Sequence, residues 1–513
     1  MGPNYSHQTC LGVYQVGTLA TFQNGLLLIF FATVLLFYTT SLFRKTNKRK
    51  IPGPGSHFLG CLTNILALSD KRKSLKVFES WCATYGPIFN VNLGPYKIAI
   101  LNSPEYIQKL LGSTDMGYLG KGFAYKPLKP LWQDGLILSK GEKWKFRRRV
   151  LEKHMFSFKT LLTYMSTLNE EGDKYMLKIG ERFASGKEEE VEDLLMNYTL
   201  EVVTSAAFGK SVAEMDSFAN GELNITDTIN RGKEIVATRA FNPCLLLDFI
   251  WRLHPLYKVE RIVIQSLKLM GAAATMDNRV IPGKKYRAGI KDDLTAAGVP
   301  VDGIIEESLT LMSAGYETTA SSIHFLLLLL ALHPEHQEIC RNEIDSVFED
   351  VDLCPSGQLQ FRALSKLKHM EMCVNESLRL LPTVFFFERK IDTPLVLEED
   401  LVLETGTEVA FLVQGLHKNP KYYPDPEKFI PGRFSEEEIK SRSQFAHIPF
   451  AAGPRKCIGY KFAMMIMLSF SAKLLREYVL ETTEKLDEIV FLPNVTMSPE
   501  TPIKFRIKKR LNK

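Results

Sequence analysis

The side chain with the most distinctive chemical surroundings in this 513-residue sequence is Cys457. It ends the loop Phe450-Ala-Ala-Gly-Pro-Arg-Lys-Cys and is followed, after Ile458 and a glycine, by a long apolar run. A helix N-terminus and the adjacent Arg455 and Lys456 favour a thiolate over a thiol, and loop N–H groups can hydrogen-bond the sulfur. A lone cysteine is more often a small core residue. In this setting it is also a candidate soft ligand for haem iron, where a thiolate favours O–O cleavage.

A second group lies midway along the longest apolar helical pattern, in Ala-Gly-Tyr-Glu-Thr-Thr at positions 314–319. One interpretation is a helix with a notch of small residues for packing. The functional interpretation is that Ala314 and Gly315 let the helix pass close to a flat cofactor and leave room for dioxygen. Thr318 can hydrogen-bond back to a helix carbonyl or to oxygen, and Glu317 can relay protons from solvent, which O–O cleavage requires.

A third group, Trp144 and Arg148, places an indole N–H and a guanidinium one helical turn apart. Both groups only donate hydrogen bonds, as binding of an anionic carboxylate requires. The neighbouring Arg147 and Arg149 are interpreted as surface charges. With Lys456 and Lys461 they could also form a basic face for an acidic redox partner.

Together these residues resemble the cytochrome P450 family. The cysteine loop matches F-x-x-G-x-R-x-C-x-G at every defined position, and positions 314–318 match A-G-x-[DE]-T. Two further motifs follow the family's order, Glu-Ser-Leu-Arg at 376–379 and Pro-Gly-Arg-Phe at 431–434. Either of these is weak alone, because an i,i+3 ion pair is ordinarily a surface feature worth under about 0.5 kcal/mol. The resemblance covers about residues 50–510.

The resemblance implies haem b as cofactor, with Cys457 as the axial ligand of the iron and Glu317 and Thr318 as the catalytic pair. Residues implied to bind the cofactor, the last four of them at its propionates, are Ala314, Gly315, Phe450, Gly453, Trp144, Arg148, Arg389 and Arg455. Glu376, Arg379 and Arg433 are implied to form a buried structural network.

Two segments, positions 141–151 and 417–434, resemble the animal branch that includes fatty-acid omega-hydroxylases. Many members of that branch carry a glutamate that can esterify the haem, where this chain has Ala314. We therefore expect non-covalently held haem, and terminal-carbon hydroxylation does not follow from the resemblance.

The elements that must position these groups are mainly helices. Periodicity and breakers predict helices over Val301–Leu332, Leu364–Leu381 and Ile458–Tyr478, a hairpin over Phe89–Leu101, and strand-rich segments over 384–413 and 489–507. Few strands segregated near the ends predict a mainly α, α+β fold with small sheets, and the resemblance implies the cytochrome P450 fold.

The N-terminus predicts a membrane anchor. Residues 25–43 form nineteen uncharged, mostly apolar positions, about 28 Å of helix against a hydrocarbon core of about 30 Å. Five positive charges follow at 44–50, which places this end in the cytosol. We expect a lumenal tail over 1–24, an anchor over 25–43, a basic and Pro/Gly-rich linker over 44–55 and a cytosolic catalytic domain over 56–513, in the endoplasmic reticulum membrane.

Composition excludes several other classes. Five of the six net positive charges lie in residues 44–50, so the rest of the chain is nearly neutral and nucleic acid is not an expected partner. The eight cysteines include no C-x-x-C, and the chain has neither G-x-G-x-x-G after a strand nor H-E-x-x-H. These absences argue against a zinc finger, a bound nucleotide and a zinc protease site.

The predicted activity is that of a haem-thiolate monooxygenase. Its pocket is expected between Leu311, Ala314, Thr318 and the run 383–387 on one side and the stretch 117–138 on the other. Aromatic, uncharged walls suit a fatty acid, terpenoid, sterol or xenobiotic, and membrane lipid would concentrate such a substrate. Electrons would come from NADPH through NADPH–cytochrome P450 reductase, with cytochrome b5 as a further donor, because no nucleotide site is apparent. Two alternatives are a reductase-independent isomerase or dehydratase of lipid peroxides and a non-catalytic haem sensor.

Overall fold

The computed structural model describes residues 49–55, 60–93, 96–219, 222–240, 242–276 and 289–510. The predicted lumenal tail, the anchor over 25–43 and positions 44–48 of the linker lie outside these residues. Among the described residues, one helix, Val301–Leu332, is long and apolar enough to cross a membrane by length and composition. Most of it is buried within the protein, so it is a core helix.

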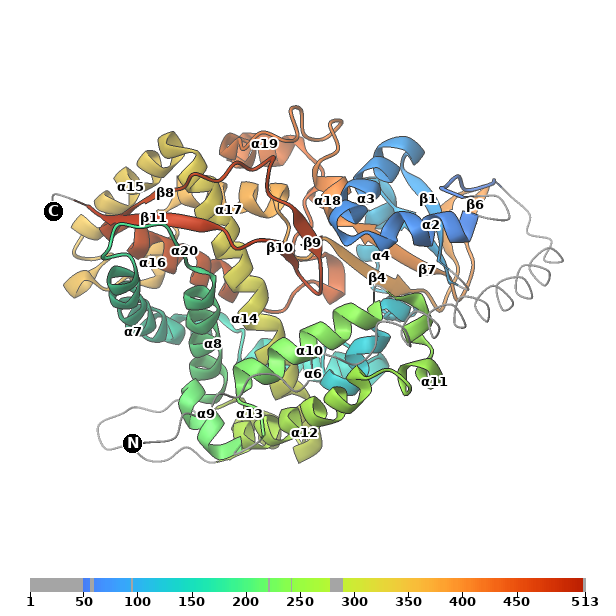
Figure 1. Ribbon diagram of the computed structural model, residues 1–513, viewed down its shortest axis with the longest axis horizontal. Coiled ribbons are helices and arrows are strands. Elements are labelled where there is room, and N and C mark those ends of the chain that lie inside the picture. The colour runs from blue at the N-terminus through green and yellow to red at the C-terminus, as the bar shows by residue number, and fades with distance from the viewer. Residues whose placement is uncertain are drawn as a thin grey trace, which may run out of the picture.

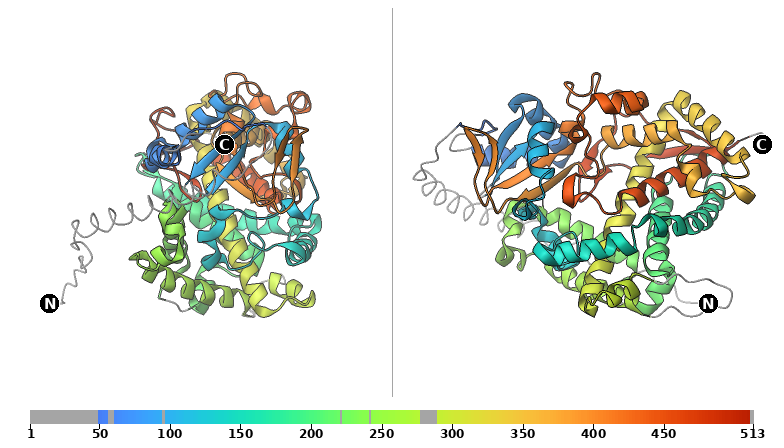
Figure 2. Two further views of the ribbon diagram at one scale, coloured as in Figure 1. Left: turned by 90° about the vertical axis from the view of Figure 1, so that its right-hand side faces the viewer. Right: turned by 180° about the vertical axis from the view of Figure 1, so that it is seen from behind.

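Helices fill most of the molecule, and a four-stranded sheet lies at one end (Figures 1 and 2). This arrangement agrees with the predicted mainly helical fold with small sheets. The longer described helices are α2 (Gly60–Ser69), α3 (Lys71–Tyr85), α4 (Pro104–Leu111), α6 (Gly141–His154), α7 (Phe158–Arg182), α8 (Glu192–Phe208), α9 (Val212–Ala219), α10 (Ile225–Ala240), α12 (Leu256–Thr275), α14 (Val301–Leu332), α15 (Pro334–Glu349), α17 (Lys368–Leu380) and α20 (Tyr460–Glu477). Short ones are α5 (Lys129–Trp132), α11 (Asp248–Trp251), α13 (Ile290–Ala296), α16 (Phe361–Leu364), α18 (Val413–His417) and α19 (Glu436–Ser441).

The largest described sheet has the strand order β1 (Ile88–Leu93), β2 (Tyr96–Leu101), β7 (Glu408–Leu412) and β4 (Phe386–Lys390). β1 and β2 pair antiparallel, as the predicted hairpin requires, β2 and β7 are parallel, and β7 and β4 are antiparallel. Phe387 faces Phe411 across the last pair, and their rings stack at 4.6 Å. The smaller sheets are β3 (Glu189–Glu190) with β11 (Lys504–Lys509) and β8 (Tyr478–Glu481), β9 (Phe491–Pro493) with β10 (Met497–Pro499), and β5 (Leu395–Glu398) with β6 (Leu401–Leu403).

α14 runs through the centre of the molecule (Figure 1), where α8, α12, α17 and α20 pack against it. Pro300 precedes its first turn and Pro334 follows its end, so the apolar pattern begins and ends where prolines dictate. Its second half, which includes Phe325 and five successive leucines, is almost fully buried in the main core. The packing of this half holds α14 in place and thereby positions its Ala314–Thr319 segment.

The predicted helix over Leu364–Leu381 is wrong in its first turn, because the structure has α16 and α17 separated by residues 365–367. The cause lies in a different helix. Glu343 of α15 accepts hydrogen bonds from the backbone N–H groups of His369 (2.9 Å) and Met370 (3.1 Å). A carboxylate at these unpaired N–H groups caps a helix, so α17 begins where α15 supplies its cap.

The second half of the Pro/Gly-rich segment, which was predicted as a linker, makes hydrogen bonds to the folded domain. The N–H of Asn90 on β1 donates to the carbonyl of Pro52 at 2.8 Å, and Asn64 Nδ2 donates to that of Pro54 at 3.1 Å. A Cβ on Gly53 would lie 2.0 Å from the Asn90 carbonyl oxygen, so only glycine permits this approach. Residues 52–55 therefore pack on the folded domain.

Candidate active site

The predicted site residues converge on one internal cavity of about 960 Å³. Its lining includes Cys457 from the loop before α20, the Ala314–Thr319 segment of α14, and Phe385–Phe387 at the start of β4. Trp144 and Arg148 of α6 and the cations Arg389 and Arg455 also line it. Segments more than 300 residues apart in the sequence thus supply one site.

The cysteine loop is held in a conformation that glycine makes possible. Gly453 has φ +69°, and a Cβ there would lie 1.6 Å from the carbonyl oxygen of Leu111. The N–H of Cys457 donates to the carbonyl of Phe450 at 2.9 Å, which closes the loop. α20 begins at Tyr460, so the sulfur lies just before a helix N-terminus, as predicted.

The pKa of Cys457 is shifted in the opposite direction from the one that the sequence predicts. The Cys457 side chain is exposed to the cavity, but desolvation by the surrounding protein raises the pKa of its thiol, and this effect outweighs the Gly459 N–H and the positive charges of Arg148 and Lys456, which lower it. The loop alone therefore does not favour a thiolate. A bound metal cation deprotonates a coordinating thiol, so the loop positions a sulfur whose ionisation is coupled to metal binding.

Three hydroxyl groups beside the cavity donate hydrogen bonds to backbone carbonyls of α14. Thr318 Oγ1 donates to the Ala314 carbonyl and Thr319 Oγ1 to that of Gly315, both at 2.8 Å, and Ser322 Oγ donates to the Thr318 carbonyl at 2.7 Å. The predicted back-bonding of Thr318 is present, and the helix remains continuous. A Cβ on Gly315 would lie 3.1 Å from Val203, so this glycine also permits close packing of α14 on α8.

Glu317 is held by partners that its motif does not contain. Thr496 Oγ1 donates to Glu317 Oε1 at 2.6 Å, and Lys233 Nζ of α10 lies 3.2 Å from the same oxygen. All three residues line the cavity. A carboxylate with an ammonium and a hydroxyl partner can exchange protons along a short path from α10 toward Thr318.

Three cations, Lys121, Arg389 and Arg455, gather at the cavity with few counter-charges. Arg455 Nη1 and Nη2 donate to the carbonyls of Leu136 (3.1 Å) and Ser139 (2.6 Å), whereas its Nε is buried without a partner. Burial and the nearby Arg389 lower the pKa of Arg455 to about 9, and burial and both arginines lower that of Lys121. The nearest carboxyl, Glu388, has a pKa raised to about 8 by burial and by Glu408.

This donor set fits the propionates of haem, since buried cations are stable only when paired with anions. Cys457 supplies a soft axial ligand on the same cavity. Haem, when bound, supplies the iron centre at which dioxygen is activated. The residues present would hold it through Cys457, Arg389, Arg455 and the further cation Lys121, which the sequence motifs did not reveal.

The two predicted α6 residues differ in what they contact. Trp144 is buried, and the Arg455 guanidinium lies 4.3 Å from its ring centre. Arg148 Nη1 donates to the Lys456 carbonyl at 2.7 Å, which ties α6 to the cysteine loop. The interpretation of Arg147 as a surface charge is wrong. It is buried between Glu306 (2.6 Å) and Glu307 (2.9 Å) of α14.

The structural network forms as the resemblance implied. Arg379 Nε and Nη2 bind the two oxygens of Glu376 at 2.6 and 2.8 Å, and Arg433 Nε lies 3.4 Å from Glu376 Oε1. The remaining Arg379 donors bind the carbonyls of His417, Pro426 and Lys428. All five guanidinium N–H groups of a residue with no exposed surface are thereby satisfied.

The expected cavity walls are present, and two further walls were not predicted. Leu311, Ala314 and Thr318 face the 383–387 run, and residues between Lys121 and Ile137 form the wall expected from 117–138. α10 and the turn 494–496 close the cavity on other sides. Only the folded chain brings these two segments to α14, so no local sequence signal identifies them.

Comparison with known proteins agrees with this geometry. The sequence profile of the cytochrome P450 family matches residues 52–507. Cytochrome P450 4c21 of Blattella germanica is 28% identical over 95% of this chain and 98% of its own length. Cytochrome P450 4c3 of Drosophila melanogaster is 27% identical over 97% of both chains, and cytochrome P450 4V2 of Mus musculus is 28% identical over 83% and 82%.

The fold, the cysteine loop and this match establish the class of the protein: the chain belongs to the cytochrome P450 family. It is a cytochrome P450 monooxygenase of the haem-thiolate type, and its relatives named above are numbered in P450 family 4, the branch that its sequence resembles.

Proposed function

We propose that this monooxygenase hydroxylates or epoxidises a lipophilic substrate at the endoplasmic reticulum membrane, with haem b held non-covalently. The observation that carries the proposal is the cavity itself. Its lining includes Cys457, Glu317, Thr318 and an extensive apolar wall. Leu311, Phe385 and Phe386 supply wall groups that exclude water and favour an apolar ligand over a polar one.

The chain's own residues have distinct roles in the reaction we propose. Cys457 would bind the iron of a haem in the cavity, and Trp144, Arg148, Arg389 and Arg455 would hold its propionates. Thr318 Oγ1, which donates to the Ala314 carbonyl, would supply a proton to the cavity. Glu317, between Thr496 and Lys233, replaces that proton from the α10 side. Ala314 offers no carboxylate for esterification, in agreement with non-covalent haem.

We further propose that electrons come from NADPH through NADPH–cytochrome P450 reductase, with cytochrome b5 as a second donor. Lys145, Arg149 and Lys153 support this proposal, because they are exposed and spaced four residues apart on one face of α6. Arg148 ties this helix to the cysteine loop. A basic face there suits an acidic partner that must approach the Cys457 side.

The membrane part of the proposal rests on the sequence. The uncharged run 25–43 and the basic residues after it favour a single-pass anchor with residues 1–24 in the lumen and the catalytic domain from 56 in the cytosol. Such an anchor would hold the cavity near membrane lipid, in which an apolar substrate concentrates.

The decisive experiment compares electron sources for one purified, haem-loaded enzyme. Fatty acids, terpenoids and sterols are first screened by the spectral shift that a bound substrate causes. Turnover of the best ligand is then measured with NADPH and reductase, and separately with a lipid peroxide alone. Oxygenated product only in the first assay supports the proposal. Product only from peroxide indicates an isomerase or dehydratase. If no ligand causes NADPH to be consumed, the protein is a sensor.

Two variants test the residue roles within that experiment. Cys457→Ala is expected to abolish the thiolate-type spectrum of the reduced carbon monoxide complex. Thr318→Ala is expected to retain this spectrum and to divert most NADPH electrons to hydrogen peroxide. Thr319→Ala, which removes the neighbouring hydroxyl with the same back-bond, is the matched control. Full coupling in the Thr318 variant would contradict its role in holding the proton.

A further inference from the structure

Two helices distant from the cavity carry the same pair of potential metal ligands. His336 and Cys340 lie four residues apart on α15, and His369 and Cys373 lie four residues apart on α17. Residues at i and i+4 share one helix face. Each helix therefore presents an imidazole and a thiol on one face, and α15 and α17 pack against each other.

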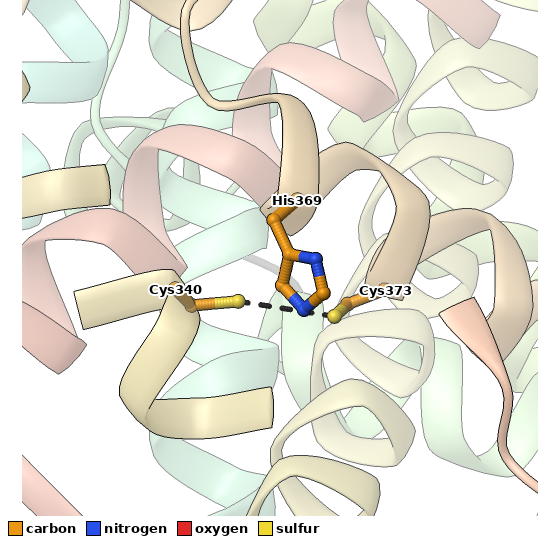
Figure 3. A group of neighbouring side chains, drawn as sticks. All are labelled: Cys340, His369 and Cys373. Atoms are coloured by element: carbon orange, nitrogen blue, oxygen red, sulfur yellow. Dashed lines mark hydrogen bonds between the residues drawn. The ribbon is translucent and has the colours of Figure 1, made fainter. Parts of the chain in front are cut away.

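Three of these four donors converge where the helices meet, and the fourth, His336, lies beside His369. Cys340 Sγ lies 3.8 Å from Cys373 Sγ, and one ring nitrogen of His369 lies within 4.8 Å of both sulfurs. Figure 3 shows the His369 imidazole pointing toward the gap between the two thiols. His336 Nδ1 lies 3.2 Å from His369 Nε2. Both cysteines are fully buried, whereas the two histidines are half-buried.

These separations agree with a tetrahedral site. With zinc–sulfur bonds of about 2.3 Å, two sulfurs at a tetrahedral angle lie about 3.8 Å apart. With zinc–nitrogen bonds of about 2.0–2.1 Å, two imidazole nitrogens lie about 3.3 Å apart. The observed sulfur and nitrogen pairs are at 3.8 and 3.2 Å. Three donors already lie within 4.8 Å of one another, and His336 contacts one of them, His369.

The surroundings hold this arrangement in place. Glu343 of α15 binds the N–H groups of His369 and Met370, so the first turn of α17 is fixed relative to α15 without a metal. Packing alone does not require two thiols and two imidazoles at matching positions of two helices. The half-buried histidines leave a path by which an ion can enter.

We propose that Cys340, Cys373, His369 and His336 bind one zinc ion that fixes α15 to α17. Two thiolates and two imidazoles form a common structural zinc set. Sequence inspection did not reveal it, because C-x-x-C and H-E-x-x-H describe other ligand spacings. The ion would fix α17 one turn before Glu376, so it would act on stability and take no part in the oxygenation reaction.

The test uses the full-length, haem-loaded protein, so that Cys457 is not a vacant thiol. It is incubated with zinc chloride, passed over a chelating column and analysed for zinc and iron. We expect about one zinc per haem, and a zinc-edge X-ray absorption spectrum with two sulfurs at about 2.3 Å and two nitrogens at about 2.0–2.1 Å. Haem iron does not contribute at the zinc edge, and this measurement needs no variant.

Variants then assign the ligands. Cys340→Ser is expected to lower retained zinc at least about tenfold, and His336→Ala to weaken zinc binding in a competition with a chromophoric chelator. Cys354→Ser, a buried cysteine outside the cluster, is expected to retain zinc. Any of three results would overturn the proposal: retained zinc below about a tenth of the haem, a zinc shell of oxygen only, or a Cys340–Cys373 disulfide in the freshly purified protein. These readouts do not depend on catalytic activity.

Discussion

Two groups of buried charges in this protein are built in opposite ways. Around Glu376, one carboxylate binds two guanidinium groups, and backbone carbonyls take the remaining Arg379 donors. At the cavity, the positive charge of Arg389 lowers the pKa of both Lys121 and Arg455, and Arg455 Nε has no acceptor. The first group is complete in charge within the chain, because Glu376 lies beside both arginines, although Arg433 Nε itself makes no hydrogen bond. The second requires an anion that the chain does not supply.

The difference separates structural from ligand-binding charges. A buried ion pair with all its hydrogen bonds made holds elements together, whereas unpaired buried cations cost free energy until a ligand neutralises them. The region near Glu376 joins α17 to the segment 425–433 before the cysteine loop. The cavity group faces the space in which the haem propionates would lie. Breaking the first should destabilise the fold, and breaking the second should release the cofactor.

The largest effect is expected from Glu376→Gln. Removal of this carboxylate charge leaves Arg379 and Arg433 buried without a counter-charge, which costs about 3–5 kcal/mol of folding free energy. Urea unfolding of the haem-loaded protein measures this loss. The control is Glu371→Gln, a partly exposed carboxylate on the same helix, for which little change is expected. A loss below about 1 kcal/mol in the Glu376 variant would mean that the network is not essential to the fold.

A smaller effect of a different kind is expected from Lys121→Met. This change removes one cation from the incomplete group, and a charge-assisted hydrogen bond to a propionate is worth about 1.5–3 kcal/mol. Haem transfer to excess apomyoglobin should become at least about tenfold faster. Lys126→Met, an exposed lysine of the same segment, is the control. Equal release rates for the two variants would remove Lys121 from the cofactor site.

Glu388, a buried carboxyl beside Lys121, predicts that the stability of the protein depends on pH. Its pKa in the folded protein is about 8, against an ordinary value of 4.5, because it is buried beside Glu408. Between these two values Glu388 ionises in the unfolded chain while it keeps its proton in the folded protein. Its contribution to the free energy of unfolding is therefore most favourable below pH 4.5 and falls as the pH rises to 8.

Glu388→Gln removes this titration and preserves an acceptor for the Ala124 N–H. The variant should therefore be more stable than the wild type at pH 8.5 by on the order of 1–3 kcal/mol, with a smaller advantage at pH 6. Unfolding midpoints at the two pH values measure the difference. A wild-type advantage that grows with pH would show that Glu388 is ionised in the folded state, paired with the cations of the incomplete group.

Local sequence patterns predicted the parts of the site that lie within one element. The cysteine loop, the Ala314–Thr319 segment and the ends of α14 follow from contiguous residues and prolines. The features that depend on tertiary contacts were either not predicted or predicted wrongly. Arg147 is buried because Glu306 and Glu307 of α14 lie across from it. α17 starts late because Glu343 caps it from α15. Lys233 and Thr496 reach the cavity only through the fold, and within the expected wall 117–138 no local signal marks Lys121 as a cation of the site.

The smallest effect is expected from breaking the ion pair Arg72–Glu500, which matches Arg379–Glu376 only in its contact distance. Arg72 Nη2 lies 2.6 Å from Glu500 Oε2, the same separation as Arg379 Nε from Glu376 Oε2. The Arg72 and Glu500 side chains are 64% and 30% exposed, whereas both side chains of the buried pair are fully covered. Water solvates the partners of the exposed pair when it is broken, and salt screens their attraction.

Arg72→Gln should therefore change the free energy of unfolding by less than about 0.5 kcal/mol, and that change should vanish in about 1 M salt. Urea unfolding at low and high salt measures it beside Glu376→Gln. Because the two pairs have equal contact distances, contact distance cannot account for a difference between the two losses. Comparable losses in both variants would mean that contact distance, and not burial, sets the strength of ion pairs in this protein, and the contrast between its complete and incomplete charge groups would fail.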